Sequence, residues 1–160
     1  LNVLSNAIQD YISAQIKSGA DCIQIFDSWG GILKEQYNEF SLKYINDIRT
    51  SLSEDVPMIL YAKGTRVASL LTHTNINCFN LDCEESIDDY IDMPLTVQGN
   101  FDPKYFHKDD SELKDIADTI FDKYHKKQNY IFNVGSGITP DINPDKVGVF
   151  LERLRLFNSK

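Results

Sequence analysis

Five polar segments stand directly after apolar runs, and they are the places in this sequence where chemistry could sit. Their side chains offer hydroxyl, carboxylate, amide and amine groups, and four of them contain glycine, which lets a backbone turn sharply or approach a ligand closely. Because the carboxyl ends of parallel strands meet at one edge of a sheet, we expect these segments to share one site. The segments are 26–31 (FDSWGG), 62–65 (AKGT), 81–83 (LDC), 98–103 (QGNFDP) and 133–137 (NVGSG).

Three stretches at these positions allow more than one chemistry. The Gly135-Ser136-Gly137 turn could aim backbone N–H groups at a phosphate, although it matches neither GxGxxG nor a Walker loop. Lys63 could form a Schiff base, but an ion pair or a loop anchor is the simpler interpretation. The stretch 82–89 (DCEESIDD) is rich in carboxylates, which suits either a cation site or a helix whose acidic first turn complements the helix dipole.

The histidines give no support to a metal site. His73, His107 and His125 stand apart, without HxxxH or His-x-Cys spacing. We therefore expect no metal site.

The elements that must position these segments alternate between apolar runs and helical patterns. Repeated βα units with short turns predict an α/β fold with a parallel sheet, either doubly wound or a TIM (β/α)8 barrel. A closed barrel takes about 250 residues, so this chain can hold only part of one, about five βα units after a leading helix. The expected strands are 21–28, 56–63, 78–82, 95–100 and 130–134, and the expected helices are 1–17, 37–52, 65–74, 82–89, 113–124 and 144–154.

Composition excludes several classes of protein. The chain has 160 residues, 42% of them hydrophobic, and a formal net charge of −8, which argues against nucleic acid as a partner. No apolar run approaches the roughly 20 residues that span a bilayer, so no membrane segment is expected. Three cysteines, Cys22, Cys78 and Cys83, make a disulfide framework improbable and favour a reducing compartment such as the cytoplasm.

Taken together, the strand-end segments resemble the C-terminal part of the uroporphyrinogen decarboxylase family. The resemblance covers essentially all 160 residues, and we expect residues 1–160 to be the C-terminal portion of one barrel domain whose N-terminal portion is absent. The matching segments are 19–31 (GADCIQIFDSWGG), 56–64 (VPMILYAKG), 80–82 (NLD), 95–103 (LTVQGNFDP) and 130–150 (YIFNVGSGITPDINPDKVGVF).

The resemblance implies a function and a site. Members of this family are (β/α)8 barrels of the cytoplasm, often homodimers. Without metal or organic cofactor they remove CO2 from the four acetate side chains of uroporphyrinogen to give coproporphyrinogen in haem biosynthesis. The resemblance implies that Ser28 hydrogen-bonds a substrate carboxylate, that Phe26 lines the pocket beside the macrocycle, and that Ser136 lies on the last substrate-contacting loop.

The sequence also departs from the family pattern. The family's arginine-rich motif, its Asp that contacts the pyrrole nitrogens and a substrate-contacting Tyr belong to an earlier region, so we assign no catalytic residue here and expect the isolated chain to be inactive. Ser136 stands where the family usually has His, and Cys83-Glu84 stands where it usually has Trp-Thr. Two alternatives remain: a corrinoid or thiol methyltransferase of the same superfamily, and a non-catalytic half-barrel relic.

Overall fold

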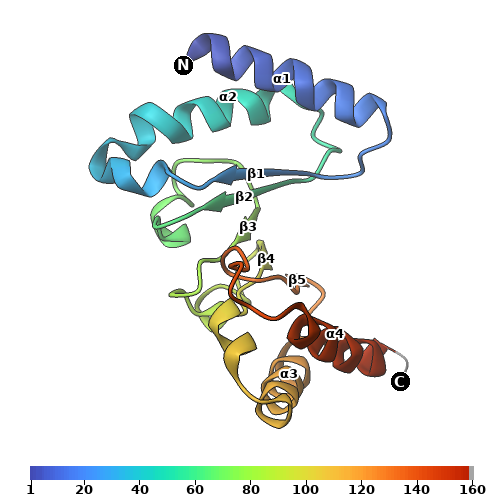
Figure 1. Cartoon of the computed structure of the whole chain (residues 1–160). Helices are drawn as coiled ribbons and strands as arrows, with labels where there is room; N and C mark the ends of the chain where they lie inside the picture. The colour runs from blue at the N-terminus through green and yellow to red at the C-terminus, as the bar shows by residue number, and fades with distance from the viewer. Residues whose placement is uncertain (159–160) are drawn as a thin grey trace.

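A single parallel sheet organises the chain. The computed structural model describes residues 1–158, and its five strands are hydrogen-bonded in chain order, β1-β2-β3-β4-β5 (Figure 1). Every neighbouring pair is parallel, which confirms the predicted α/β class. The strands are β1 (Ile23–Asp27), β2 (Met58–Ala62), β3 (Cys78–Asn80), β4 (Thr96–Gln98) and β5 (Tyr130–Ile131).

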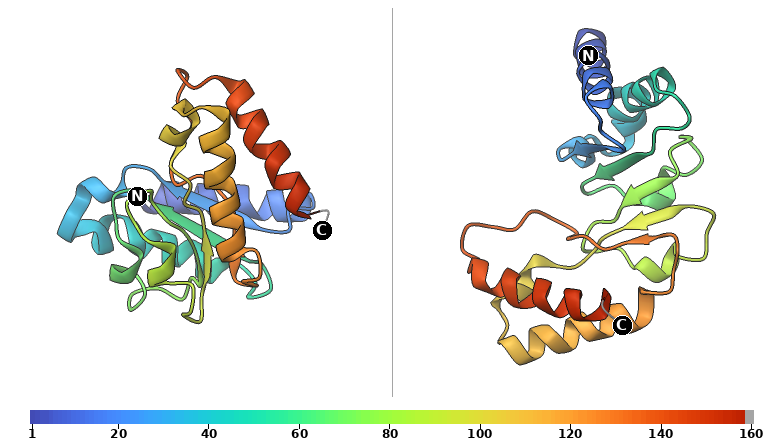
Figure 2. Two further views of the ribbon diagram at one scale, coloured as in Figure 1. Left: turned by 90° about the horizontal axis from the view of Figure 1, so that it is seen from below. Right: turned by 90° about the vertical axis from the view of Figure 1, so that its right-hand side faces the viewer.

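Four α-helices lie at the two ends of this sheet. Helices α1 (Asn2–Lys17) and α2 (Lys43–Ser51) lie at the β1 end, whereas α3 (Asp110–Tyr124) and α4 (Pro144–Asn158) lie at the β5 end (Figures 1 and 2). The remaining helical segments are a π-helical segment, η2 (Asn38–Leu42), and the 3-10 segments η1 (Gly30–Gln36), η3 (Val67–Ser69), η4 (Ile87–Asp89) and η5 (Pro103–His107).

Local capping explains where the last two helices begin. The Asp109 carboxylate accepts a hydrogen bond from the Glu112 backbone N–H at 2.9 Å, which satisfies a free donor in the first turn of α3. Asn143 accepts from the Asp145 N–H at 2.9 Å, and Pro144 occupies the first position of α4. The sequence predicted this second start correctly.

The α-helices expected over 65–74 and 82–89 are wrong, because both segments contain only a short 3-10 turn. After β2, side chains of another segment accept hydrogen bonds from the backbone N–H groups. The Val67 N–H donates to the Glu85 carboxylate at 3.0 Å, and the Ala68 N–H donates to the Tyr90 hydroxyl at 3.4 Å. In the 82–89 segment, the Asn100 side-chain amide donates hydrogen bonds to the backbone carbonyls of Asp82 and Glu85, at 2.7 and 2.5 Å. These tertiary hydrogen bonds replace the i→i−4 pattern of an α-helix.

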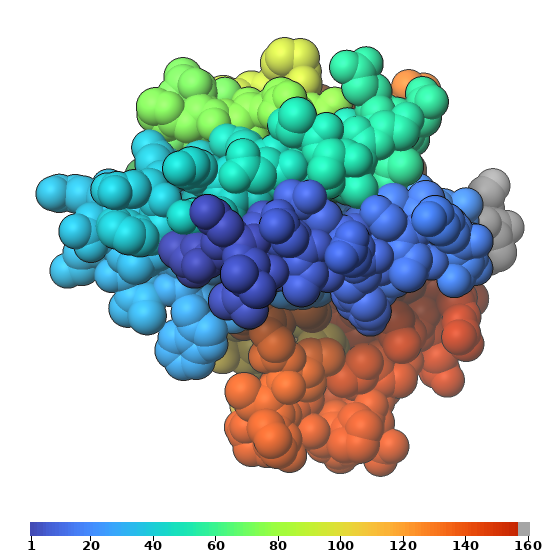
Figure 3. All heavy atoms as spheres, turned by 90° about the horizontal axis from the view of Figure 1, so that it is seen from above, coloured from blue at the N-terminus to red at the C-terminus, as the bar shows by residue number. Residues whose placement is uncertain are grey.

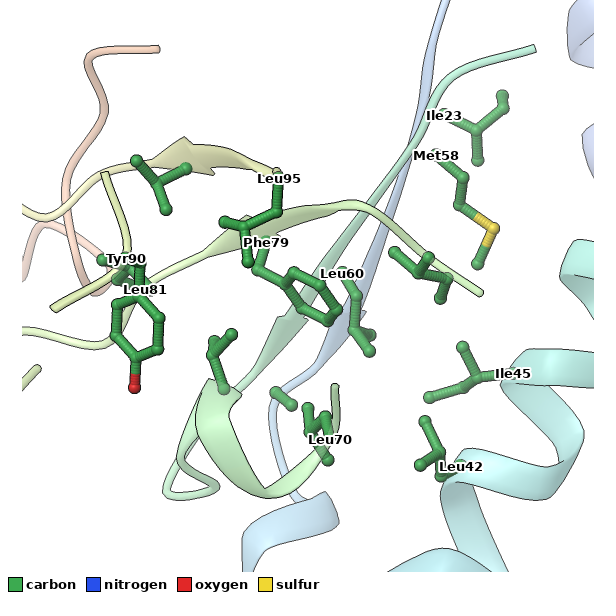
Figure 4. Close-up of a cluster of buried hydrophobic side chains, with 14 of the residues drawn as sticks. Ile23, Leu42, Ile45, Met58, Leu60, Leu70, Phe79, Leu81, Tyr90 and Leu95 are labelled. Atoms are coloured by element: carbon green, nitrogen blue, oxygen red, sulfur yellow. The ribbon is translucent and has the colours of Figure 1, made fainter. Parts of the chain in front are cut away.

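One face of the sheet forms the main hydrophobic core. Strand register places Ile25, Leu60, Phe79, Val97 and Tyr130 in one row across all five strands. Phe79, Leu60 and Val97 are fully buried in this row, because α1, α2 and the short helical turns cover it. Figure 4 shows Phe79 and Leu60 side by side, with side chains of η2, α2 and the segment after η3 around them. A second cluster, around Phe101, Phe106 and Phe150, joins α3 and α4 to the β5 end.

The β1 end of the molecule presents apolar side chains to solvent. Helix α1 lies across the face seen in Figure 3, with residues 27–40 beside its first turns. Leu4 is 63% exposed and Ile32 is 71% exposed, and a groove of about 230 Å³ runs between α1, β1 and α2. Exposed apolar surface of this kind marks an interaction surface.

Candidate functional site

The second face of the sheet carries a mixed row, with two amide side chains at its centre, on the side opposite the apolar core row. Phe26, Tyr61, Asn80, Gln98 and Ile131 pair across the five strands, one residue further along each strand than the core row. Successive strand residues point to opposite faces, so these side chains lie away from the helices that cover the core. In a barrel this second face would be the interior.

A hollow of about 370 Å³ opens above this row, at the carboxyl ends of the strands. It brings together the three residues that the sequence singled out, Phe26, Ser28 and Ser136, although they are up to 110 positions apart in the chain. The other lining residues come from the ends of β2, β3 and β5: Tyr61, Lys63, Asn80, Asn133, Val134 and Gly137.

Gly99, which we also expected at this rim, does not line the hollow. It is buried with a φ of +115°, and a Cβ at this position would lie 3.2 Å from the Leu81 carbonyl oxygen. Gly99 therefore serves the close approach of the β4 end to the β3 end, and any side chain there would be strained.

Side-chain amides form the floor of the hollow. The buried Asn80 Oδ1 accepts from Gln98 Nε2 at 2.8 Å and from Asn133 Nδ2 at 3.0 Å, and its own Nδ2 donates to the Leu81 carbonyl at 3.1 Å. Gln98 Nε2 also reaches Gln24 Oε1 at 3.1 Å. The network links β1, β3, β4 and the segment after β5, so it fixes the strand ends relative to one another.

Two aromatic rings form one wall. The Phe26 ring meets the Tyr61 ring edge-on, with centroids 6.1 Å apart and an interplanar angle of 67°. Phe26 is 65% exposed, whereas Tyr61 is 7% exposed. An exposed ring in a ligand-sized hollow offers a flat apolar surface against which a planar ligand can pack.

Hydrogen bonds to the Asp27 side chain hold the loop that carries Ser28. The Asp27 carboxylate accepts from the Gly30 N–H at 2.8 Å and from the Ser41 hydroxyl at 2.5 Å. Burial, reinforced by the Asp27 charge, raises the pKa of the neighbouring Tyr37 hydroxyl, which therefore stays neutral. Gly31 closes the same loop: a Cβ there would lie 2.3 Å from the Lys63 carbonyl oxygen.

The turn that carries Ser136 is held by residues of three other strand ends. The Gly135 N–H donates to the Phe101 carbonyl at 2.9 Å, and the Gly135 carbonyl accepts from the Tyr61 hydroxyl at 3.1 Å. The Cys83 thiol donates to the Ser136 hydroxyl oxygen at 3.6 Å. Burial raises the pKa of this thiol, and the carboxylates of Asp102 and Asp82 act in the same direction.

The hollow is poor in positive charge. Lys63 is the one basic side chain among its lining residues. Arg49 hydrogen-bonds the Ser53 and Glu54 carbonyls, Arg153 forms a two-point ion pair with Asp118 on α3, and Arg66 lines a different, smaller hollow. A polyanionic ligand would need more positive charge than these lining residues supply.

Sequence reasoning missed Tyr61 and Asn80 as lining residues, whereas Asn133 belongs to the 133–137 segment that we expected at the shared site. The signal was present for Asn80, because a polar residue between Phe79 and Leu81 interrupts an otherwise apolar strand. It was also present for Tyr61, which lies two residues before Lys63 and therefore on the same face of the sheet. Alternation within the strands would have found both.

The acidic stretch 82–89 does not gather into one site. Asp82 accepts from the Gly64 N–H at 3.2 Å, Glu85 accepts from the Tyr90 hydroxyl at 2.6 Å, and Asp88 pairs with Lys123 and Tyr124 of α3. Across residues 1–158, no three His, Cys, Asp or Glu side chains lie together as metal ligands would. Within the same residues, no helix is long and apolar enough to cross a membrane.

Fold and site together define a class: a partial (β/α)8 barrel with a ligand-sized hollow at the carboxyl ends of its strands. Comparison of the fold agrees. A chain described as a vitamin-B12-independent methionine synthase from Listeria monocytogenes superposes with a TM-score of 0.62 at 19% identity, over 99% of this chain and 54% of that one. This likeness concerns the fold alone.

Sequence comparison gives the family. The profile of the uroporphyrinogen decarboxylase family matches residues 1–157, and the chain belongs to this family. Uroporphyrinogen decarboxylases of Pseudoalteromonas translucida and Hydrogenovibrio crunogenus are each 34% identical over 100% of the chain and 48% of their own length. That of Alcanivorax borkumensis is 35% identical over 95% of the chain and 46% of its own length. The chain thus spans about half the length of the curated relatives it matches.

Proposed function

We propose that this chain provides one wall of a uroporphyrinogen decarboxylase site. The whole enzyme would remove CO2 from the four acetate side chains of uroporphyrinogen to give coproporphyrinogen. One observation carries the proposal: Phe26, Ser28 and Ser136, from strand ends far apart in the chain, line one hollow in a member of this family. As a haem-pathway enzyme it would act in the cytoplasm, and the full-length protein would be a homodimer.

The chemistry asks for positioning more than for reactive groups. Protonation of an electron-rich pyrrole carbon turns the ring into an electron sink, so that the electrons of the bond to the departing carboxylate can flow into it as CO2 leaves. A proton then converts the exocyclic carbon to a methyl group, and loss of the first proton restores the pyrrole. The site must hold the ring still and stabilise the positive charge that develops on it. No step in this sequence calls for a metal or an organic cofactor.

The lining residues suit the binding part of this task. The exposed Phe26 ring, braced by Tyr61, would pack against the face of a pyrrole. Ser28 and Ser136 would donate hydrogen bonds to side-chain carboxylates of the substrate. Lys63 would pair with one further carboxylate, which agrees with its interpretation as an ion-pairing residue.

The opposite wall would come from a further segment of the enzyme. We infer that residues 1–160 are the C-terminal portion of one barrel domain. An octacarboxylate needs several cations, and Lys63 alone supplies positive charge to the hollow among its lining residues. The exposed apolar side chains of α1 and η1 would be covered by the same segment. The isolated chain should therefore not decarboxylate uroporphyrinogen.

A chimera tests the proposal. The amino-terminal half of the Pseudoalteromonas translucida relative is fused before Leu1, and coproporphyrinogen formation is followed by chromatography after oxidation to porphyrins. We expect activity from the chimera and none from the isolated chain. Ser28→Ala should raise KM about tenfold, the loss expected for one hydrogen bond to a charged group, whereas Ser111→Ala on exposed α3 should change nothing. A chimera that unfolds cooperatively yet yields no coproporphyrinogen would contradict the proposal.

Ser136 in place of the family's usual His, and Cys83-Glu84 in place of its Trp-Thr, favour the relic, whereas no observation on residues 1–158 favours the methyltransferase. A corrinoid or thiol methyltransferase of this superfamily would need His and Cys ligands for zinc, and no such group gathers within residues 1–158. The amide network of Asn80, Gln98 and Asn133 stabilises the strand ends in an active site and in a relic alike, so only the activity of the chimera separates the two.

A further inference from the structure

We propose that Cys83 and Tyr61 are positioning residues of this site. The Cys83 thiol donates a hydrogen bond to the Ser136 hydroxyl oxygen, and the Tyr61 hydroxyl donates to the Gly135 carbonyl. The turn is thereby fixed, and the Ser136 hydroxyl keeps its own proton for a carboxylate in the hollow. The donation from Ser136 to a ligand carboxylate deepens the proposed function and rests on it, whereas the two hydrogen bonds to the turn are independent of the proposed function.

The first argument is the fit between Cys83 and the turn. A Cβ on Gly135 would lie 2.8 Å from both the Cys83 backbone nitrogen and its sulfur, closer than real Cβ contacts. The β3 end and the turn are therefore in close contact at a position where only glycine fits. Gly137, two residues further on, has no atom within 4 Å of the corresponding position. The close approach is therefore specific to Gly135, the residue before Ser136.

The second argument is the direction of the hydrogen bonds. A hydroxyl has one proton and two lone pairs, so a Ser136 oxygen that accepts from the thiol still has a proton to donate. Cys83 remains a protonated donor at neutral pH, because burial raises the pKa of its thiol by more than the hydrogen bond with Ser136 lowers it, and the nearby Asp102 and Asp82 raise it further. Burial likewise raises the pKa of Tyr61 to about 12, so the Tyr61 hydroxyl remains a donor too.

The third argument is that the two contacts come from different strands. Tyr61 belongs to β2 and Cys83 follows β3, whereas the turn follows β5. Together they hold the turn across the hollow, so that Ser136 faces the space lined by Phe26 and Ser28. Apart from these two contacts, the Gly135 N–H donates to the Phe101 carbonyl, and Asn133, two residues earlier, hydrogen-bonds Asn80, so Cys83 is the contact to the Ser136 side chain itself.

The hydrogen bonds are tested without a ligand, on the full 160-residue chain. The infrared S–H stretching band of Cys83 is identified as the band that disappears in Cys83→Ala, with Cys22→Ala as the matched control on an exposed thiol. Ser136→Ala should shift the Cys83 band to the frequency of a free thiol, whereas Gly137→Ala should not. A Cys83 band that ignores Ser136→Ala overturns the proposal.

Tyr61 is tested by amide hydrogen exchange. Tyr61→Phe removes only the hydroxyl, and exchange in the 133–138 segment should become about tenfold faster, as expected for loss of one buried hydrogen bond. Tyr11→Phe, on an exposed ring of α1, is the matched control and should leave this segment unchanged. Unchanged exchange in Tyr61→Phe would overturn the role of Tyr61.

Ligand binding tests the last step. The probe is uroporphyrin, the stable oxidised macrocycle, titrated by fluorescence. Ser136→Ala should weaken binding about tenfold and Cys83→Ala about threefold, and the double variant should bind like Ser136→Ala alone, because Cys83 acts through Ser136. If the losses of binding in Cys83→Ala and Ser136→Ala add up in the double variant, Cys83 does not act through Ser136, and this part of the proposal is overturned. If the unmodified chain and the chimera both fail to bind uroporphyrin, the proposed function fails, while the infrared and exchange results still decide the two hydrogen bonds.

Discussion

Replacing the buried Asn80 by alanine should destabilise the chain far more than replacing an asparagine at the surface. The side chain is 4% exposed and makes three hydrogen bonds, to Gln98, Asn133 and the Leu81 carbonyl. Each buried neutral hydrogen bond contributes about 1 kcal/mol, and a partner left unsatisfied costs about 1–3 kcal/mol. Water can enter from the hollow and satisfy some partners, so we expect a loss of about 3 kcal/mol in the free energy of unfolding.

The assay is urea and thermal unfolding followed by circular dichroism. For a chain of this length, about 3 kcal/mol corresponds to a fall in Tm of about 6–12 °C. The matched control is Asn46→Ala. Asn46 also makes two hydrogen bonds, with the His73 carbonyl and the Thr74 hydroxyl, but it lies at the surface of α2.

Water replaces the partners of Asn46, and alanine favours the helix, so this control should lose less than about 1 kcal/mol. Both variants remove the same side chain, so the difference between them reports the burial of Asn80, its one additional hydrogen bond and the helix preference of alanine at position 46. If Asn80→Ala and Asn46→Ala unfold at the same urea concentration, the amide network does not hold the strand ends together, and our account of the floor of the hollow is wrong.

Three further outcomes are expected. Gly31→Ala should lower stability by about 1–3 kcal/mol, because its Cβ would lie 2.3 Å from the Lys63 carbonyl oxygen. Gly148→Ala on α4, where no atom lies near the new Cβ, should raise stability by about 0.5–1 kcal/mol. Chemical denaturation measures the sign of both changes. Hydrogen bonds from Lys123 and Tyr124 lower the pKa of Asp88 below its usual 3.8. Its stabilising contribution is therefore present above that value and lost at lower pH, so the stability deficit of Lys123→Met should shrink below about pH 4, and a constant deficit would contradict the pairing. The chain should self-associate with rising concentration through its exposed apolar surface, and Leu4→Glu should weaken this in sedimentation velocity runs; equal association by both proteins would argue against that surface.

Much of the fold could be predicted from the sequence because apolar runs determine parallel strands directly. Ile59, Leu60 and their neighbours give a strand that is buried along its whole length, and the segments after such strands converge by topology alone. The order of apolar runs and polar segments therefore predicts that segments 26–31 and 133–137 meet at one edge of the sheet, where they line the same hollow, whereas the choice of Phe26, Ser28 and Ser136 within them came from the family resemblance.

The errors arose where tertiary contacts override local propensity. The segment around Val67 has a helical pattern, but Glu85 and Tyr90 bind its backbone N–H groups from the next loop. The partners of Cys83 and Asn80 could not be predicted either, because they lie more than 50 residues away, at Ser136 and Asn133. Only the register of the sheet brings such residues together.

The identity of spatial and sequential strand order has a consequence for synthesis on the ribosome. Each strand from β2 onward pairs with the strand translated just before it, so no strand has to wait for a distant partner. A growing chain can thus add each new strand to the edge of the sheet that has already formed. The edge of each strand is exposed to aggregation only while the next crossover is translated.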